Sequence, residues 1–546
     1  MNLPKNSREQ GMARSQSIEL TLPPVTTEKP RNATATFTRN AIFSMGRLLV
    51  ATLVALVLPA YLTHSLPVET YGAWVLILQL GAYVAYLDFG VQNGVSKFVA
   101  EYEARGEFTG ASQRASAGLA IMLMISIAGV LLTLVLAWRV PYLFHEMPAS
   151  LYRDARISLL FIGISLSFGL LCSVYAAIFL GLQRYAIPMA VLIINRVLFT
   201  AVICLAVFWH SSLALMGALV AVVNVSTGLL QIGAWRKMAS HVRVSLRGLD
   251  YGVLKKMMAY CSVLAIWSAG MLCVSGLDLT IVARYDFTQT GFYSIATLPT
   301  NFIASILAAA LGPFLPTTSA LSVHRSPNEM GGILSRTTRY SMILLLLSGL
   351  PLLVAAYPIL RVWVGPLYAL HSVGFLRILV LANIIRLVCM PYSTMLVATE
   401  SQKIAIVGVV IEAIVNVGSS LYFVRHVGAI GVAYGTMLGS FVSVGMHFAF
   451  NMHYTYQKFA ITRTRLFLQG VLRPAVIAIP SLLLLPLWWS SSEPAFTIPA
   501  WFAWGMSTIL ATWFLGLDRN ERDGLIHRVK SRLFFFRNPA ASAVHK

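Results

Sequence analysis

The feature that most constrains this chain is a pair of long apolar stretches near its N-terminus. Ala41 to Leu62 and Tyr71 to Gly94 flank a short turn, Thr63 to Thr70, that contains no Lys or Arg. At a rise of about 1.5 Å per residue, each stretch is long enough as a helix to cross the roughly 30 Å hydrocarbon layer of a membrane. The two stretches therefore predict a transmembrane hairpin.

Apolar spans of the same kind recur to the end of the chain. The composition excludes a soluble multidomain protein, because 57% of the 546 residues are hydrophobic, 11% are charged and the mean hydropathy is +0.74. We therefore predict an all-α polytopic membrane protein with about 14 transmembrane helices. The spans that follow the hairpin are Ser116 to Ala137, Ile157 to Leu180, Ala186 to Trp209, Leu213 to Ala234, Met258 to Thr280, Phe292 to Leu315, Tyr340 to Leu360, Val373 to Val397, Ile404 to Val424, Gly428 to Phe450, Pro474 to Trp489 and Ile498 to Gly516.

The basic residues predict the orientation of these spans. Of the 41 Lys and Arg, six lie in loops on one side and four within spans, and the remaining 31 lie in segments on the side of the N-terminus. Because cytoplasmic loops hold most Lys and Arg, both termini are predicted to be cytoplasmic. The same distribution accounts for the net charge of +21, so we expect no nucleic-acid partner.

An internal repeat divides the chain into two lobes. Gly72 and Gly291 open the second and eighth spans, and Arg184 and Lys403 precede the fifth and eleventh; each pair is 219 residues apart. Two landmarks in register predict two pseudo-symmetric six-helix lobes with two helices appended. The predicted parts are a disordered cytoplasmic tail (1–38), the N-lobe (39–234), a basic cytoplasmic linker (235–257), the C-lobe (258–451), the last two helices (452–516) and a basic amphipathic cytoplasmic tail (517–546).

Several short motifs resemble those of the polysaccharide flippases of the multidrug/oligosaccharidyl-lipid/polysaccharide exporter (MOP) superfamily. The resemblance covers nearly all of Arg39 to Gly516 and implies lobes that alternate around a central cavity to move a lipid-linked oligosaccharide outward across the bacterial inner membrane. It implies a role in exopolysaccharide or O-antigen synthesis, with membrane lipids and a polysaccharide polymerase and export machinery as partners. The motifs are Tyr71-Gly72, Leu87-Asp88-Phe89-Gly90-Val91, Glu101, Gly106-Glu107, Gly181-Leu182-Gln183-Arg184, Asp278 and Thr290-Gly291-Phe292-Tyr293.

Seven charged residues within the spans are candidates for a polar site. An ionised group facing lipid costs about 2.5 to 3.5 kcal/mol, so each needs a partner or a wet cavity. Similar depths favour three ion pairs, Arg47 with Asp88, Arg386 with Glu412 and Arg377 with Asp278, and leave Arg196 without an obvious partner. For each pair, a structural link between helices and a functional role remain alternatives.

Polar residues extend these charged positions along helical faces, which favours a cavity over isolated ion pairs. Guanidinium groups match phosphate oxygens, so the excess of arginines predicts an anionic cargo such as a polyprenyl pyrophosphate. Trp267 offers either a sugar-stacking face or ordinary packing. The candidate substrate-binding residues are Arg47, Arg196, Trp267, Asn301, Arg377 and Arg386, and the candidate ion-pair or coupling residues are Asp88, Asp278, Glu412 and Asn416.

Three other functions remain alternatives to a polysaccharide flippase. A lipid II flippase would also carry a pyrophosphate lipid, whereas a drug or cation exporter of the same fold would present acids rather than arginines. A membrane glycosyltransferase, polymerase or ligase would need a larger outward loop with acids or metal ligands than Trp138 to Arg156 provides. The five cysteines lie within spans without a metal-binding spacing, so no metal, cofactor or enzymatic activity is expected.

Overall fold

The computed structural model describes residues 33–247, 249–322, 325–399, 401–483, 498–517, 519 and 521–523. These residues form helices and no strand, and ten of the helices are long and apolar enough to cross a membrane. Shorter apolar helical stretches, Val50–Ser65 and Phe502–Gly516, add to them. The predicted all-α polytopic fold is confirmed.

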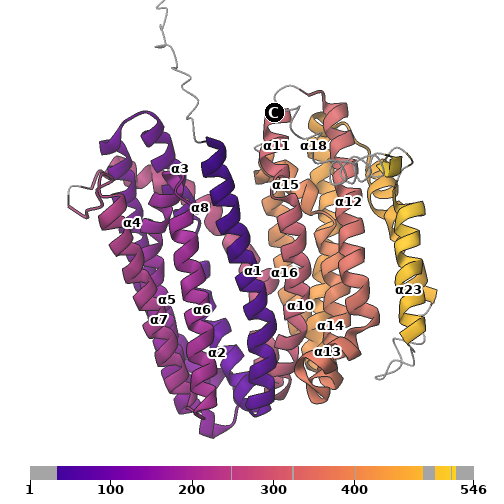
Figure 1. Cartoon of the computed structure of the whole chain (residues 1–546), viewed down its shortest axis with the longest axis horizontal. Helices are drawn as coiled ribbons and strands as arrows, with labels where there is room; N and C mark the ends of the chain where they lie inside the picture. The colour runs from indigo at the N-terminus through magenta and orange to yellow at the C-terminus, as the bar shows by residue number, and fades with distance from the viewer. Residues whose placement is uncertain are drawn as a thin grey trace, which may run out of the picture.

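The N-lobe contains seven helices, drawn from indigo to magenta in Figure 1. The long helix α5 packs against both α4 and α7, and α1 packs against α6. The bounds are α1 (Ala33–Ser65), α2 (Val68–Tyr86), α3 (Val91–Ala104), α4 (Phe108–Leu143), α5 (Ala149–Gly181), α6 (Ala186–Phe208) and α7 (Leu213–Met238).

The C-lobe repeats this arrangement with more interruptions. Its helices are α8 (Tyr251–Met271), η1 (Leu272–Gly276, a π-helix), α9 (Asp278–Tyr285), η2 (Phe287–Gln289), α10 (Thr290–Leu311), α11 (Phe314–Leu321), α12 (Pro327–Val354), α13 (Ala356–Val364), α14 (Pro366–Leu387), α15 (Met390–Ala398), α16 (Gln402–Val427), α17 (Ile430–Met446), η3 (His447–Asn451) and α18 (Met452–Phe459). The appended helices are α19 (Arg463–Leu466), η4 (Phe467–Leu472), α20 (Arg473–Ala475), η5 (Val476–Ala478), α21 (Ile479–Leu483), α23 (Ile498–Ala511) and η6 (Thr512–Gly516).

Several span limits differ from those predicted. The second span ends at Tyr86 rather than Gly94, because Phe89 (φ 47°) and Gly90 (φ 72°) turn the chain before α3 begins. Asp88 therefore lies in a turn and not in a membrane helix. The chain turns again at Gly106 (φ 72°), between α3 and α4, where only a residue that tolerates the left-handed region is unstrained.

Helix ends also differ at other spans. The first helix begins at Ala33, so residues 33–38 belong to α1 rather than to the tail, while residues 1–32 lie outside the described part of the chain. α12 begins before Tyr340, at Pro327, where Ser326 and Glu329 form a capping box and Pro327 occupies the first helical position. Residues 484–497 and most of the predicted C-terminal tail also lie outside the described residues.

The repeat predicted from two landmarks extends through both lobes. Adding 219 to Phe108, the start of α4, gives 327, the first residue of α12. Adding 219 to Phe208, the end of α6, gives 427, the last residue of α16. Gly72 and Gly291, the first landmark, are neighbours in space: a Cβ on Gly72 would lie 3.6 Å from the Gly291 nitrogen. Equivalent residues meet in this way at a pseudo-two-fold axis.

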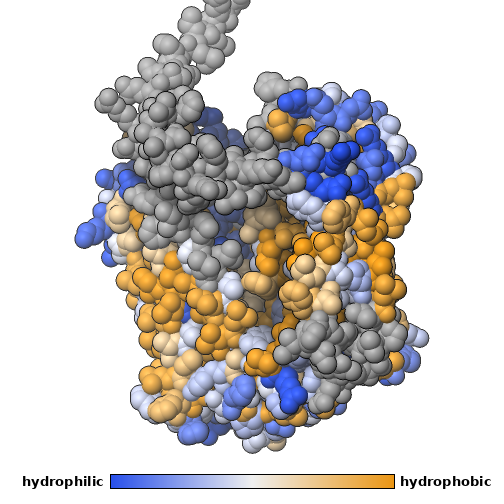
Figure 2. All heavy atoms as spheres, turned by 45° about the vertical axis from the view of Figure 1, so that its right-hand side comes forward, coloured by the Kyte–Doolittle hydropathy of each residue, from blue (hydrophilic) through white to orange (hydrophobic). Residues whose placement is uncertain are grey.

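The two lobes touch at one end and separate at the other (Figure 1). At the closed end, α2 packs against α9 and α10, and α1 packs against α13, where Trp363 Nε1 donates to Leu56 O at 2.6 Å. The start of α1, α3, α11 and α18 lie at the open end. Figure 2 shows the surface hollowed between the lobes and a hydrophobic band below a hydrophilic cap, as expected for a membrane-embedded body.

Candidate functional site

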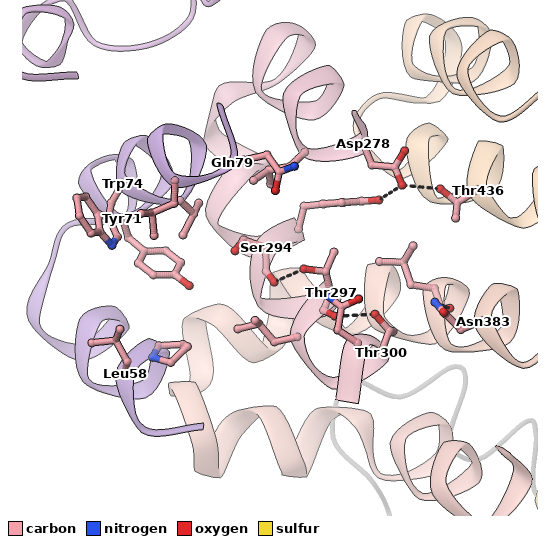
Figure 3. Close-up of a pocket in the computed structure, with 18 of the residues that line it drawn as sticks. Leu58, Tyr71, Trp74, Gln79, Asp278, Ser294, Thr297, Thr300, Asn383 and Thr436 are labelled. Atoms are coloured by element: carbon pink, nitrogen blue, oxygen red, sulfur yellow. Dashed lines mark hydrogen bonds between the residues drawn. The ribbon is translucent and has the colours of Figure 1, made fainter. Parts of the chain in front are cut away.

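A cavity of about 450 Å³ lies between the two lobes, which both contribute lining residues. Helices α1, α2 and α6 line it from the N-lobe, and η1, α9, α10, α14 and α17 line it from the C-lobe (Figure 3). The polar and aromatic lining residues are Tyr71, Trp74, Gln79, Arg196, Asp278, Tyr293, Ser294, Thr297, Thr300, Asn301, Asn383, Arg386 and Thr436.

The N-lobe wall is aromatic at the closed end and polar beside the C-lobe. Tyr71 and Trp74 project from the first turns of α2, and Leu58 of α1 lies opposite them (Figure 3). One turn or more further along α2, Gln79 Nε2 donates to the backbone oxygen of Gly276 at 2.7 Å. α2 therefore lines the cavity and also links the two lobes.

The C-lobe wall contains an interrupted helix and a buried acid. The π-helix η1 leaves backbone carbonyls outside the regular helical pattern, and side chains use them: Gly276 O accepts from Gln79 and Val274 O accepts from Asn416 Nδ2 at 2.8 Å. Directly after it, Asp278 Oδ2 accepts from Thr436 Oγ1 at 3.0 Å and from Tyr293 OH at 3.3 Å. The other oxygen, Asp278 Oδ1, is buried and has no hydrogen-bond partner among the residues that the structure describes.

Hydroxyl and amide groups cover the floor of the cavity. Ser294, Thr297 and Thr300 follow one face of α10 and bond along it, with Thr297 Oγ1 donating to Ser294 O at 2.7 Å and Thr300 Oγ1 to Thr297 O at 2.6 Å. Asn301 on the same helix and Asn383 on α14 add amide groups. Such side chains suit the hydroxyls of a sugar, which both donate and accept.

Two arginines from opposite lobes line the same cavity. Arg196 projects from α6 and Arg386 from α14. Arg386 Nη2 makes one long contact, 3.5 Å to Asn383 Oδ1, and Arg196 lies 6.0 Å from the centre of the Phe199 ring. Within the described residues, no carboxylate lies within 4.0 Å of either guanidinium. Since the lining has one acid, Asp278, the cavity carries more positive than negative groups.

The structure brings together four of the ten residues predicted for the site: Arg196, Asp278, Asn301 and Arg386. Arg377 is outside this cavity; it is 6% exposed and its Nε donates to Leu353 O of α12 at 3.4 Å. Arg47 is exposed on α1 away from the lining.

Three of the other four predicted residues are described, and none of the three lines the cavity. Glu412 and Asn416 are buried on α16, one layer behind it. Asp88 lies in the turn after α2. The side chain of Trp267 is outside the described residues.

None of the three ion pairs inferred from depth forms among the described residues. Asp88 Oδ1 is buried and has no hydrogen-bond partner among the described residues. The turn at Phe89 and Gly90 moves Asp88 off α2 and away from Arg47 of α1. Asp278 bonds Thr436 and Tyr293 instead of an arginine. Equal depth in a membrane does not define which way a side chain faces, and this is why the depth argument was wrong.

The sequence reasoning missed several lining residues. Gln79 carried a usable signal, since an amide in the middle of an apolar span is costly unless it has a partner. The sequence contained no such signal for Tyr71, Trp74 and Thr436, because aromatic residues and small hydroxyls are common at helix contacts in membranes.

Comparisons with known proteins identify the fold. No protein-family model matches the sequence, and no curated protein sequence matches it. Among solved structures, an inward-facing multidrug resistance MATE family transporter of the MOP superfamily has a TM-score of 0.62 at 15% identity, over 78% of this chain and 99% of its own. The lipid II flippase MurJ, in an inward closed conformation, has a TM-score of 0.63 at 14% identity, over 91% of this chain and 99% of its own.

A third similar structure is a MOP superfamily transporter from Pyrococcus furiosus, described as having a binding pocket of reverse polarity. Its TM-score is 0.52 at 15% identity, over 78% of this chain and 96% of its own. This chain therefore has the fold of the MOP superfamily transporters, as its motifs predicted. The comparisons fix the architecture, while the cargo has to be argued from the cavity.

Proposed function

We propose that this protein is a flippase that moves a polyprenyl-pyrophosphate-linked oligosaccharide from the cytoplasmic to the outer leaflet of the bacterial inner membrane. The observation that carries the proposal is the pair Arg196 and Arg386, which reach one cavity from opposite lobes, with no carboxylate of the described residues within 4.0 Å of either guanidinium. A guanidinium persists in a membrane protein when water, carbonyls or an anionic ligand satisfies it. A pyrophosphate held between the lobes would do so for both.

The size and lining of the cavity support this cargo. A volume of about 450 Å³ is within the usual range of ligand sites and would hold a pyrophosphate with the first sugars, while the rest of the glycan would extend through the open end. The hydroxyls of α10 and the amides of Asn301 and Asn383 would bond the sugars. The aromatic faces of Tyr71 and Trp74 lie at the closed end.

The direction of transport rests on the orientation of the open end. The segments at the open end hold most of the basic residues, and the positive-inside rule therefore supports a cytoplasmic position for this end. A cysteine introduced between Ser490 and Thr497 should then react with an impermeant external thiol reagent, and one between Arg243 and Asp250 should not. Reversed labelling would contradict the direction of transport.

Coupling to an ion gradient would use Asp278. Its buried Oδ1 lacks a donor, and Thr436 and Tyr293 hold the other oxygen, so a proton or a monovalent cation could bind there and release in turn. Asn416 and Glu412 lie in the layer behind and would support it. This role stands apart from cargo binding by the arginines.

Flipping in proteoliposomes tests the proposal. Arg196→Ala should lose most of the activity and Arg196→Lys only part, because Lys retains the charge but not the planar fork. Both should keep the thermal stability of the wild type. Arg377→Ala is the matched control: this arginine is buried and outside the cavity, so its loss should lower stability and reduce flipping only in proportion to folded protein. Normal flipping by Arg196→Ala would overturn the proposal.

A lipid II flippase is the second candidate, because the structure of MurJ matches 91% of this chain. Both cargoes present a pyrophosphate to Arg196 and Arg386, so only the glycan separates them. Presenting each lipid in the same assay decides between the two, and preferential flipping of lipid II would replace the polysaccharide assignment. Transport of a quaternary ammonium drug instead of either lipid would indicate a cation exporter, which the excess of arginines in the cavity disfavours.

A further inference from the structure

A second basic site lies at the open end of the C-lobe, outside the cavity between the lobes. It is a hollow of about 560 Å³, which we call the arginine hollow. Three separate segments meet there: the first half of α12, the region of α19 and η4, and the residues after η6. It is lined by Gly332, Ser335, Arg336, Arg339, Tyr340, Arg465, Gln469, Arg519 and Glu521.

Contacts among the lining residues hold the arginine hollow in shape. Arg339 is 5% exposed and forms a salt bridge with Glu521, which also accepts from Tyr340 OH at 2.5 Å. On the other wall, Gln469 Oε1 accepts from Arg465 Nε at 3.4 Å and from Ser335 Oγ at 3.5 Å. The contacts of Glu521, which follows η6 in the chain, thereby fix this residue to α12.

The charge of the arginine hollow is unbalanced. Among the residues that the structure describes, four arginines line it with one acid, Glu521, which is engaged by Arg339 and Tyr340. Arg336, Arg465 and Arg519 are exposed, and no carboxylate in the described part of the chain lies within 4.0 Å of them. The positive-inside rule explains why arginines occur at this end, but it does not require three distant segments to present them to one hollow.

An apolar groove begins at the edge of the arginine hollow. Tyr340 lines both, and the groove has a volume of about 350 Å³ between α10, α11 and α12. Its other lining residues are mostly apolar or small: Leu307, Ala310, Leu311, Pro313, Phe314, Thr317, Thr337, Ser341 and Leu344. Basic side chains at the membrane surface beside an apolar groove match the two parts of a lipid, a phosphate headgroup and an acyl chain.

We propose that the arginine hollow binds the phosphate headgroup of an anionic phospholipid whose acyl chain lies in the groove beside Tyr340. Guanidinium groups bind phosphate oxygens through paired hydrogen bonds, and three exposed arginines supply more donors than one phosphate can use. The bound lipid would join α12 to the appended helices. This site is separate from the cavity that contains Arg196 and Arg386, and it does not depend on the proposed cargo.

Thermal unfolding of the purified full-length protein tests the site with three probes: phosphatidylglycerol, phosphatidylcholine and inorganic phosphate. Phosphatidylglycerol should raise the unfolding midpoint of the wild type, and the other two should not. Arg336→Gln/Arg465→Gln/Arg519→Gln should weaken the phosphatidylglycerol response at least 10-fold in lipid concentration. The control Arg243→Gln/Arg247→Gln/Lys255→Gln removes the same charge from the linker region and should respond as the wild type.

Three results would overturn the proposal. One is an unchanged response of the triple hollow variant to phosphatidylglycerol. Another is an equal loss in the linker control, which would indicate a general charge effect. The third is a full response to inorganic phosphate, which would indicate a soluble ligand. If the triple variant does not fold, the single variant Arg519→Gln, at an exposed position, replaces it and should still lower the response.

Discussion

Helix α1 of the N-lobe and the interrupted helix α8–η1–α9 of the C-lobe occupy equivalent places in the repeat but differ in structure. α1 runs without a break from Ala33 to Ser65, whereas its counterpart runs from Tyr251 to Tyr285 with a π-helix between. Adding 219 to Pro59 of α1 gives 278, the position of the buried acid, and both Pro59 and Asp278 line the cavity. One position therefore carries a helix-bending residue in one lobe and an ionisable residue in the other.

The difference shows that the two lobes have the same helical arrangement but contribute different side chains to the cavity. The N-lobe provides Tyr71, Trp74, Gln79 and one arginine to the cavity, while the C-lobe provides the acid, Tyr293, the hydroxyl row of α10, both asparagines and the other arginine. Interruption of a helix frees backbone carbonyls, and here Val274 and Gly276 accept bonds from Asn416 and Gln79. The proposed coupling between binding and conformational change would therefore lie in the C-lobe.

The largest difference in flipping rate is expected between the variants Asp278→Asn and Pro59→Ala. Asp278→Asn removes the one acid found among the described lining residues and should reduce coupled flipping ~100-fold, since buried ionisable groups in membrane helices are expensive and functional. Pro59→Ala restores a backbone donor to α1 and should change the rate less than about 3-fold. Flipping rates of the two variants under the same gradient check this, and equal losses would show that the lobes are not specialised.

A second contrast separates two links at the closed end. Arg284 of α9 donates to Leu143 O at 2.7 Å, and Trp363 of α13 donates to Leu56 O at 2.6 Å. A hydrogen bond from a charged group contributes about 1.5–3 kcal/mol and a neutral one about 0.5–1.5 kcal/mol. Arg284→Ala should therefore shift the equilibrium between the two states by ~10-fold or more toward the state that is open at this end.

Trp363→Phe should shift the equilibrium toward this open state only ~3-fold, because it removes a hydrogen bond between neutral groups. Reactivity of Ser294→Cys with an external thiol reagent measures both shifts, because Ser294 lines the cavity beyond the closed end. If both variants react at the wild-type rate, these contacts do not hold the closed end together.

The smallest contrast concerns the two glycines at the pseudo-two-fold axis. A Cβ on Gly291 would lie 3.1 Å from Tyr71 Cδ1, which is too tight, whereas a Cβ on Gly72 would meet nothing closer than 3.6 Å. Gly291→Ala should therefore lower the stability of the closed state by about 1 kcal/mol, and Gly72→Ala should leave it almost unchanged. Thermal unfolding of the two variants resolves the difference, and a larger loss in Gly72→Ala would show that the axis is packed differently.

The fold was predictable to the extent that it depends on hydrophobicity and repetition. Apolar length and basic loops gave the helices, and the 219-residue offset at Gly72 and Arg184 gave the lobes. The interruptions were not predictable, because the π-helix at Leu272–Gly276 and the turn at Phe89 depend on tertiary contacts and backbone angles that leave no pattern in hydropathy.

The site was predictable in part for the same reason. Arg196, Asp278, Asn301 and Arg386 are polar residues in apolar spans, and their cost in lipid indicated a cavity. Which of the polar residues face it depends on helix rotation and packing. Arg377 and Glu412 are as unusual in sequence as Arg386, yet they face other helices.

The central claim is that one pyrophosphate is held between the lobes by Arg196 and Arg386. Equilibrium binding of a polyprenyl pyrophosphate to the wild type, Arg196→Ala, Arg386→Ala and the double variant tests it most directly. Each single substitution should weaken binding by ~10-fold or more, and the double variant should lose less than the product of the single losses, because the two arginines act on one ligand. Wild-type affinity in either single variant would contradict the claim.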